Sequence, residues 1–198
     1  MTLLYKSDSW KTPERAAEEY RSNKKVLWRV KQGQGNHGSS DPWLADIFKR
    51  IGYCKLKLED KDGAQSSYKT AALIAPSDPD SHLWHGYALY ALKRNQEAIA
   101  EYKWAISLPN PSPDVYGYLG GTYGEINEWL LARDAYRLWI EKDPKNPEAR
   151  IALAIAESRM NHFDSSEEIL QKAATDFPGN SSVQQYLTYV QQVRRGGR

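Results

Sequence analysis

The sequence is poor in several features that would point to particular functions. It has one cysteine, Cys54, so no disulfide can form within the chain. It has no long hydrophobic run, and we therefore expect a cytoplasmic protein without a signal peptide or a membrane helix. The 27 basic and 25 acidic residues leave a net charge of +2, which argues against a nucleic-acid or membrane-surface partner.

Motifs of catalytic chemistry are missing as well. Adjacent carboxylates such as Glu167 and Glu168 do not face each other on a helix. The sequence also gives no indication that a histidine lies beside the cysteine, as a catalytic Cys–His pair would require. The glycine-rich stretch 32–40 lacks the lysine and hydroxyl residue of a phosphate-binding loop. The sequence therefore predicts a protein that is not an enzyme and that has no cofactor and no metal site.

What the sequence does contain is a pattern of small and aromatic residues that returns every 34 residues. Counted from Pro113 as position 1, the pattern is clearest at three positions of four successive copies. They are Gly52, Gly86, Gly120 and Ala154 at position 8; Ala64, Ala98, Ala132 and Ser166 at position 20; and Tyr68, Tyr102, Tyr136 and Leu170 at position 24. Small residues at fixed positions indicate places where two helices approach closely, and the large residues fill the gaps between helices.

This pattern resembles that of the tetratricopeptide repeat family, in four copies over about Ala45 to Phe177. The resemblance implies an all-α fold in which each repeat is a pair of antiparallel helices, and the pairs stack into a right-handed superhelix. We expect a repeat domain over 41–181, with the four repeats at about 45–78, 79–112, 113–146 and 147–180.

Two further segments flank the predicted repeats. The tripeptide Thr12-Pro13-Glu14 is typical of a helix start, so we expect 1–40 to hold an arm, an extra helix from about Pro13 to Lys31 and a flexible linker over 32–40. Residues 182–198 have apolar residues on one helical face and glutamines on the other. They are predicted to form a helix that caps the last repeat, followed by a basic tail.

In this family the first helix of each repeat lines a concave groove, and the resemblance implies the same role here. The centre of that groove would be apolar and aromatic in repeats one, two and four. We therefore predict that a partner peptide binds in a groove lined by Lys49, Tyr53, Leu56, Leu83, Tyr87, Tyr90, Gly117, Gly121, Gly124, Ile151 and Ile155.

The three glycines of that set, Gly117, Gly121 and Gly124, share one face of a predicted helix. A glycine inside a helix costs about 0.5–1 kcal/mol relative to alanine, so some interaction should offset it. Two interpretations stay open. The glycines allow close approach of a bound peptide backbone, or they allow close packing of the helices themselves.

Two known kinds of site are matched poorly. The subfamily that clamps the C-terminal carboxylate of heat-shock chaperones is resembled only at Lys49, because Tyr53 and Trp84 stand where that subfamily has asparagine. His82 and His85 are three residues apart and could form a metal pair. They fall on core-facing positions, however, so buried imidazoles are favoured, and His85 then needs a hydrogen-bond partner.

Two functions are compatible with these features, and in both the partner is a protein or peptide. The first is a non-enzymatic adaptor or chaperone that binds a partner segment in the groove. The second is a structural or assembly subunit that docks or self-associates, for example as a homodimer, through its N-terminal helix or its exposed aromatic residues. The tryptophans that would serve the second function are Trp10, Trp28, Trp43 and Trp104.

Overall fold

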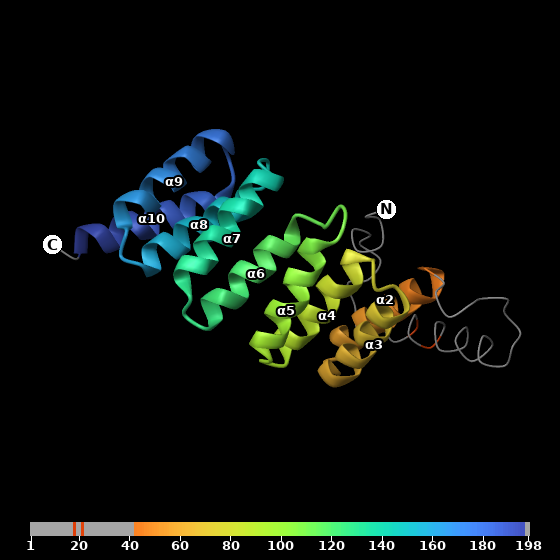
Figure 1. Ribbon diagram of the computed structural model, residues 1–198. Coiled ribbons are helices and arrows are strands. Elements are labelled where there is room, and N and C mark those ends of the chain that lie inside the picture. Colours follow the sequence, from red (N-terminus) through yellow and green to blue (C-terminus); the bar gives the residue numbers. More distant parts are fainter. Residues whose placement is uncertain (1–17, 19–20, 22–41, 197–198) are drawn as a thin grey trace, which may run out of the picture. The chain divides into compact units, whose positions relative to one another are not determined.

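The computed structural model describes Glu18, Arg21 and residues 42–196. This part of the chain contains nine α-helices and no β-strand, which confirms the predicted all-α class (Figure 1). The helices are α2 (Pro42–Lys57), α3 (Lys61–Ile74), α4 (Pro79–Ala91), α5 (Asn95–Ser107), α6 (Asp114–Glu125), α7 (Trp129–Lys142), α8 (Pro147–Arg159), α9 (Phe163–Asp176) and α10 (Ser181–Gly196). The predicted N-terminal helix and linker lie outside the described residues, apart from Glu18 and Arg21, which are helical.

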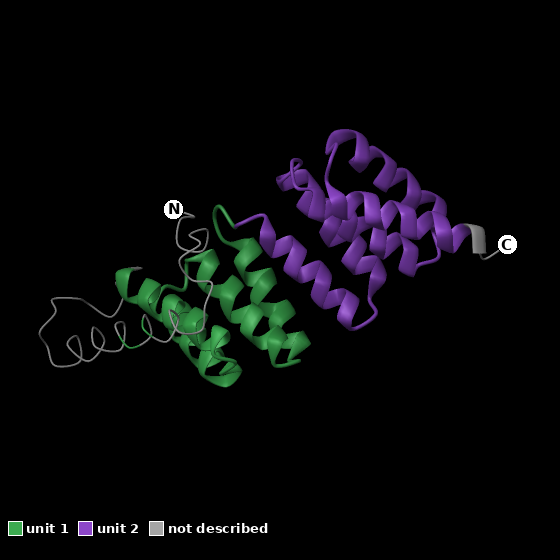
Figure 2. Cartoon of the chain, turned by 180° about the vertical axis from the view of Figure 1, so that it is seen from behind, with its two compact units in different colours: residues 1–111 green, residues 112–198 purple. Residues whose placement is uncertain are grey.

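The chain divides into two compact units, residues 1–111 and residues 112–198, drawn in separate colours in Figure 2. In unit 1 the pairs α2–α3 and α4–α5 are joined by contact between α3 and α4. In unit 2 the pairs α6–α7 and α8–α9 are joined by contact between α7 and α8, and α10 packs on α8 and α9. The division falls at the stretch 109–113, where three prolines prevent a continuous helix.

The first helices of the second and fourth repeats begin in the same way. Asp78 accepts a hydrogen bond from the Asp80 amide at 3.3 Å, and proline follows it as the first residue of α4. Asn146 accepts from the Glu148 amide at 3.0 Å, and proline again starts α8. A side-chain cap accepts hydrogen bonds from amide groups that have no partner inside the helix. Proline is tolerated as the first helical residue because the N–H group that it lacks would have no partner there.

The turn inside each repeat contains one residue in the left-handed conformation, always at position 15. These residues are Glu59, Lys93, Asn127 and Asn161, with φ between 62° and 65°. Asparagine adopts the left-handed conformation readily, whereas glutamate and lysine are sterically disfavoured in it. The first two repeats therefore carry some strain in their turns that the last two avoid.

Contacts between glycine and tyrosine hold the helix pairs together, as the repeated pattern predicts. A Cβ atom added to Gly120 would lie 2.5 Å from the ring of Tyr136, so α6 and α7 can approach this closely only because position 8 is glycine. The same relation holds for Gly52 with Tyr68 and for Gly86 with Tyr102. In the fourth repeat Ala154 and Leu170 take these places, and both are buried.

The last helix, α10, caps unit 2. Its buried residues Val183 and Val190 join the apolar cluster of α8 and α9. Ser181 would be position 1 of a fifth repeat, so Gln185, Thr188 and Gln192 take the positions that a second helix would cover. All three are exposed and polar, which explains why stacking ends there. Within the described residues, none of the helices combines the length and apolar character that crossing a membrane requires.

Candidate partner-binding site

The two first helices of unit 1, α2 and α4, contact each other and carry a half-buried aromatic surface. Tyr53 and Leu56 from α2 pack with Trp84 from α4 against the buried Tyr68. The Trp84 ring stacks on Tyr68 with 6.3 Å between ring centres and meets Tyr87 edge-on at 5.9 Å. We call this surface the aromatic face of unit 1, and it consists of Tyr53, Leu56, Trp84, Tyr87 and Tyr90.

Two lysines lie over rings of the aromatic face. Lys57 Nζ is 5.3 Å from the centre of the Tyr53 ring, and Lys93 Nζ is 5.7 Å from the centre of the Tyr90 ring. Lys57 is the last residue of α2 and Lys93 follows the cap of α4, so both lie near the C-terminal end of a first helix, where the helix dipole favours positive charge. This end of the face therefore places cations beside aromatic rings, an arrangement that suits an acidic group next to an apolar one.

Lys49, predicted to line the groove, is instead part of the packing between α2 and α4. Its side chain is 11 % exposed, and its Nζ lies 2.9 Å from carboxylate oxygens of both Asp46 and Asp78. Burial opposes the charged ammonium, but the hydrogen bonds to Asp46 and Asp78 outweigh it and raise the pKa of Lys49. Its charge is therefore neutralised within the chain, which further disfavours a carboxylate clamp.

The same correction applies to every residue at position 5 of a repeat. Leu83 is 3 % exposed and Ile151 is 6 % exposed, so both belong to the core. Gly117 faces the second helix of its own pair, since an added Cβ would lie 2.7 Å from the Trp139 ring. Position 5 thus points between helices, and Lys49, Leu83, Gly117 and Ile151 are no longer part of the proposed site.

The residues at position 9, one turn further along each first helix, are partly exposed to solvent. Tyr53, Tyr87 and Ile155 are half-buried there. At Gly121 an added Cβ would meet only the Tyr136 hydroxyl, at an ordinary 3.9 Å. Helix packing therefore accounts for Gly117 and also for Gly124, whose added Cβ would lie 2.9 Å from the Trp129 ring, but not for Gly121.

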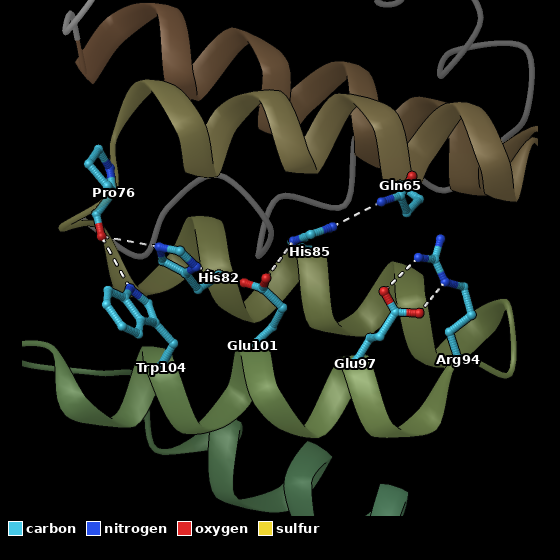
Figure 3. A network of polar contacts seen from close by, with 8 residues as sticks. All are labelled: Gln65, Pro76, His82, His85, Arg94, Glu97, Glu101 and Trp104. Atoms are coloured by element: carbon cyan, nitrogen blue, oxygen red, sulfur yellow. Dashed lines mark hydrogen bonds and ion pairs between the residues drawn. The ribbon is translucent and has the colours of Figure 1, made fainter.

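The histidine pair is packed on a carboxylate that sequence reasoning missed. His82 Nδ1 lies 2.7 Å from Glu101 Oε2, and His85 Nδ1 lies 3.2 Å from Glu101 Oε1 (Figure 3). Partial burial opposes ionisation of Glu101, but the contacts with His82 and His85 outweigh it and lower its pKa to about 2. Among the residues that the structure describes, no group of three His, Cys, Asp or Glu side chains is arranged to hold a metal ion.

Two tyrosines on α10 are exposed, although the sequence pattern placed Tyr186 on the apolar face of the capping helix and did not single out Tyr189. Tyr186 is 39 % exposed and Tyr189 is 59 % exposed. They occupy positions 6 and 9 of the incomplete fifth repeat, the positions that hold Trp84 and Tyr87 in unit 1. Counting the 34-residue period beyond the fourth repeat would have found them.

Comparison with known proteins agrees with this architecture. Residues 51–113 match the tetratricopeptide repeat family. A sequence comparison with curated proteins gives no match. Three solved structures illustrate the similarity in fold, although their sequence identity to this chain is low.

The first is MamA from Desulfovibrio magneticus RS-1, with a TM-score of 0.67 and 21 % identity over 80 % of this chain and 88 % of that chain. The second is YrrB, described as a repeat protein with an unusual peptide-binding site, with a TM-score of 0.61 and 14 % identity over 76 % and 78 %. The third is the first repeat domain of Spaghetti (RPAP3) bound to the HSP90 peptide SRMEEVD, with a TM-score of 0.58 and 21 % identity over 61 % and 98 %. The family match over residues 51–113, the stacked helix pairs of each unit and the similar structures together show that the chain has the tetratricopeptide repeat fold.

Proposed function

We propose that this protein is a non-enzymatic adaptor or chaperone that binds a peptide segment of a partner protein on the aromatic face of unit 1. The observation that carries the proposal is the set of half-buried rings on α2 and α4. Tyrosine and tryptophan give large contact areas at low entropic cost and dominate many protein interfaces. Two of the similar structures, YrrB and the Spaghetti domain, are described as binding peptides, which supports a role of the same kind.

The chemistry of the face suggests the kind of segment it takes. The rings of Tyr53, Tyr87 and Tyr90 suit two or three apolar or aromatic anchors. Lys57 at the end of α2 suits an acidic residue beside those anchors. A free C-terminal carboxylate is not required, because Lys49 is already paired with Asp46 and Asp78.

The test is co-purification from the native host with mass spectrometry of the retained proteins. We expect wild type to retain a dominant partner that the double variant Tyr87→Ala/Tyr90→Ala loses. A matched control is Tyr186→Ala/Tyr189→Ala, which removes two exposed tyrosines from unit 2 and should leave that partner bound. Circular dichroism must show that each variant is folded. Retention of the partner by a folded Tyr87/Tyr90 variant would show that the aromatic face is not the site.

A second candidate function is that of an assembly subunit, favoured by exposed leucines on α7. Leu131 is 45 % exposed and Leu138 is 42 % exposed, and their spacing of seven residues places them on one helical face. Trp104 on α5 of unit 1 is 54 % exposed as well. Sedimentation of wild type and Leu131→Glu/Leu138→Glu tests this idea. An oligomer that dissociates in the variant supports it, and a wild-type monomer contradicts self-association through α7.

A further inference from the structure

The exposed face of α7 carries leucines that the repeat fold does not require. Leu130, Leu131 and Leu138 are 59 %, 45 % and 42 % exposed. The side of α7 that packs on α6 and α8 is a different one, formed by alanines and a tyrosine. The corresponding positions of α9, one repeat later, are polar: Asp164, Ser165 and Lys172. The leucines are therefore particular to α7, and a group of exposed apolar residues of this kind marks a surface for contact with another molecule.

Charged residues lie beside these leucines. Asp134 and Arg137 are both 57 % exposed. Asp134 lies 3.0 Å from Arg133, its neighbour in the sequence, and Arg137 lies 3.5 Å from the carboxylate of Glu157 on α8. More than half of each side chain is thus accessible to a group of opposite charge on a partner.

A second copy of this chain fits these charges, but only in one direction. If two α7 helices packed in parallel around a two-fold axis, Asp134 of one copy would face Asp134 of the other, and the two Arg137 side chains would also face each other. Like charges in such positions repel. If the helices packed antiparallel, side chains of opposite charge would face each other instead.

The antiparallel arrangement also matches the leucines. Residues 131 and 138 are equally far from the midpoint between 134 and 135, so a two-fold axis there places Leu131 of each copy beside Leu138 of the other. Asp134 and Arg137 both lie on the same flank of these leucines, because successive residues turn by about 100° around the helix. Asp134 of one copy and Arg137 of the other are then two residues apart along the axis, about 3 Å, which an arginine side chain spans.

We propose that α7 pairs with α7 of a second copy of this chain, antiparallel, around a two-fold axis between residues 134 and 135. Leu131 and Leu138 form the apolar contact, and two reciprocal pairs of Asp134 with Arg137 fix its direction. Such an interface closes with two copies, so the product is a dimer and not a filament. One helix pair belongs to the small class of interfaces, below about 1,200 Å² in total, so the dimer is weak and forms at high protein concentration. This proposal rests on the second candidate function, self-association through α7, and adds the number of copies and their direction.

The first test is sedimentation equilibrium of the full chain at low salt over a wide range of protein concentration. Wild type is expected to behave as a monomer in equilibrium with a dimer. Asp134→Arg makes both reciprocal pairs repulsive, and we expect it to weaken dimerisation by about tenfold or more. The matched control is Glu168→Arg, which makes the same change of charge at the equivalent exposed position of α9 and should leave dimerisation unchanged.

The outcomes separate this proposal from the function on which it rests. A wild-type monomer at every concentration overturns both. A wild-type dimer that Leu131→Glu/Leu138→Glu dissociates but Asp134→Arg leaves intact overturns only the antiparallel pairing, because parallel helices would not bring residue 134 beside residue 137. Equal weakening by Asp134→Arg and Glu168→Arg also overturns it, since the net charge of the chain would then be the cause.

A second test mixes two variants whose charges complement each other. Asp134→Arg leaves basic side chains at both positions, and Arg137→Glu leaves acidic side chains at both. Each variant alone is expected to dimerise more weakly than wild type, whereas the equimolar mixture should regain a dimer of about wild-type strength. Circular dichroism must first show that Arg137→Glu is folded, because Arg137 contacts the buried Glu157, and the first test decides if it is not. A mixture that associates no better than its separate components overturns the proposal.

Discussion

Alanine substitution of the three glycines on one face of α6 distinguishes glycines that are required for helix packing from a glycine that lies on an open surface. At Gly117 an added Cβ would lie 2.7 Å from the ring of Trp139, and at Gly124 it would lie 2.9 Å from the ring of Trp129. Real Cβ atoms essentially never come this close to other side chains, so either the ring or the helix must shift. At Gly121 the nearest atom is at 3.9 Å, and alanine fits without any shift.

The expected free energies of unfolding follow from two opposing effects. Alanine gains about 0.5–1 kcal/mol over glycine in a helix at all three positions. Overpacking costs about 1–3 kcal/mol where the neighbour cannot move. We therefore expect Gly121→Ala to stabilise unit 2 by about 0.5–1 kcal/mol and Gly117→Ala to destabilise it by about 1–2 kcal/mol. Gly124→Ala should fall between them, because its added Cβ would lie 2.9, 3.2 and 3.7 Å from the nearest atoms of the Trp129 ring, whereas the one at Gly117 would lie 2.7, 2.8 and 2.9 Å from those of Trp139.

The assay is thermal unfolding followed by circular dichroism, with the three variants compared under one set of conditions. For a domain the size of unit 2, 1 kcal/mol corresponds to about 4–8 °C in Tm, so effects of this size are measurable. The order of Tm should be Gly121→Ala, wild type and then Gly117→Ala. If Gly121→Ala lowers Tm as much as Gly117→Ala does, Gly121 is also a packing residue and the assignment of an open surface there is wrong.

Two further stability predictions concern unit 1. Glu101→Gln should lower the free energy of unfolding by up to about 3 kcal/mol near pH 7, since a pKa lowered from 4.5 to about 2 means that folding favours the carboxylate. That contribution is fully present above about pH 4.5 and is lost as pH falls through about 2, so urea unfolding should show the gap to wild type closing over this range. A gap that does not change with pH would show that the carboxylate charge is not its source. Glu59→Asn should stabilise by several tenths of a kcal/mol, because φ is 63° there and asparagine adopts that conformation more readily. A lower Tm for Glu59→Asn would show that the Glu59 side chain makes a contribution larger than its backbone cost.

The fold could be predicted from the sequence because the deciding contacts are local and repeated. In the third repeat, Gly120 and Tyr136 lie sixteen residues apart and meet across one helix pair, and the equivalent pairs meet in the first two repeats. The 34-residue period in the sequence reflects this repeated contact. Four copies of the period therefore predict the helix pairs and their order. The contact of Glu101 with the two histidines appears once and not in other repeats, which is why no period could reveal it.

The candidate site could be predicted only in part, and the reason is geometric. Positions 5 and 9 of a first helix differ by four residues, which is about 40° around the helix axis. Both therefore fall on what a helical projection shows as one face. The neighbouring helix decides between them, and it covers Lys49, Leu83 and Ile151 but leaves Tyr53, Tyr87 and Ile155 half-buried.

Gly121 shows what this distinction means for function. Its neighbours Gly117 and Gly124 are explained by the tryptophan rings that cover them, so their cost in helix propensity is offset within the chain. No ring covers Gly121 in this way, so packing in the described structure does not offset the helix stability that is lost with a glycine there. Position 9 is also where unit 1 presents the rings of Tyr53 and Tyr87. A residue that reduces stability without improving packing, at a position that holds Tyr53, Tyr87 and Ile155 in the other repeats, is expected where a surface serves contact with another molecule rather than the fold.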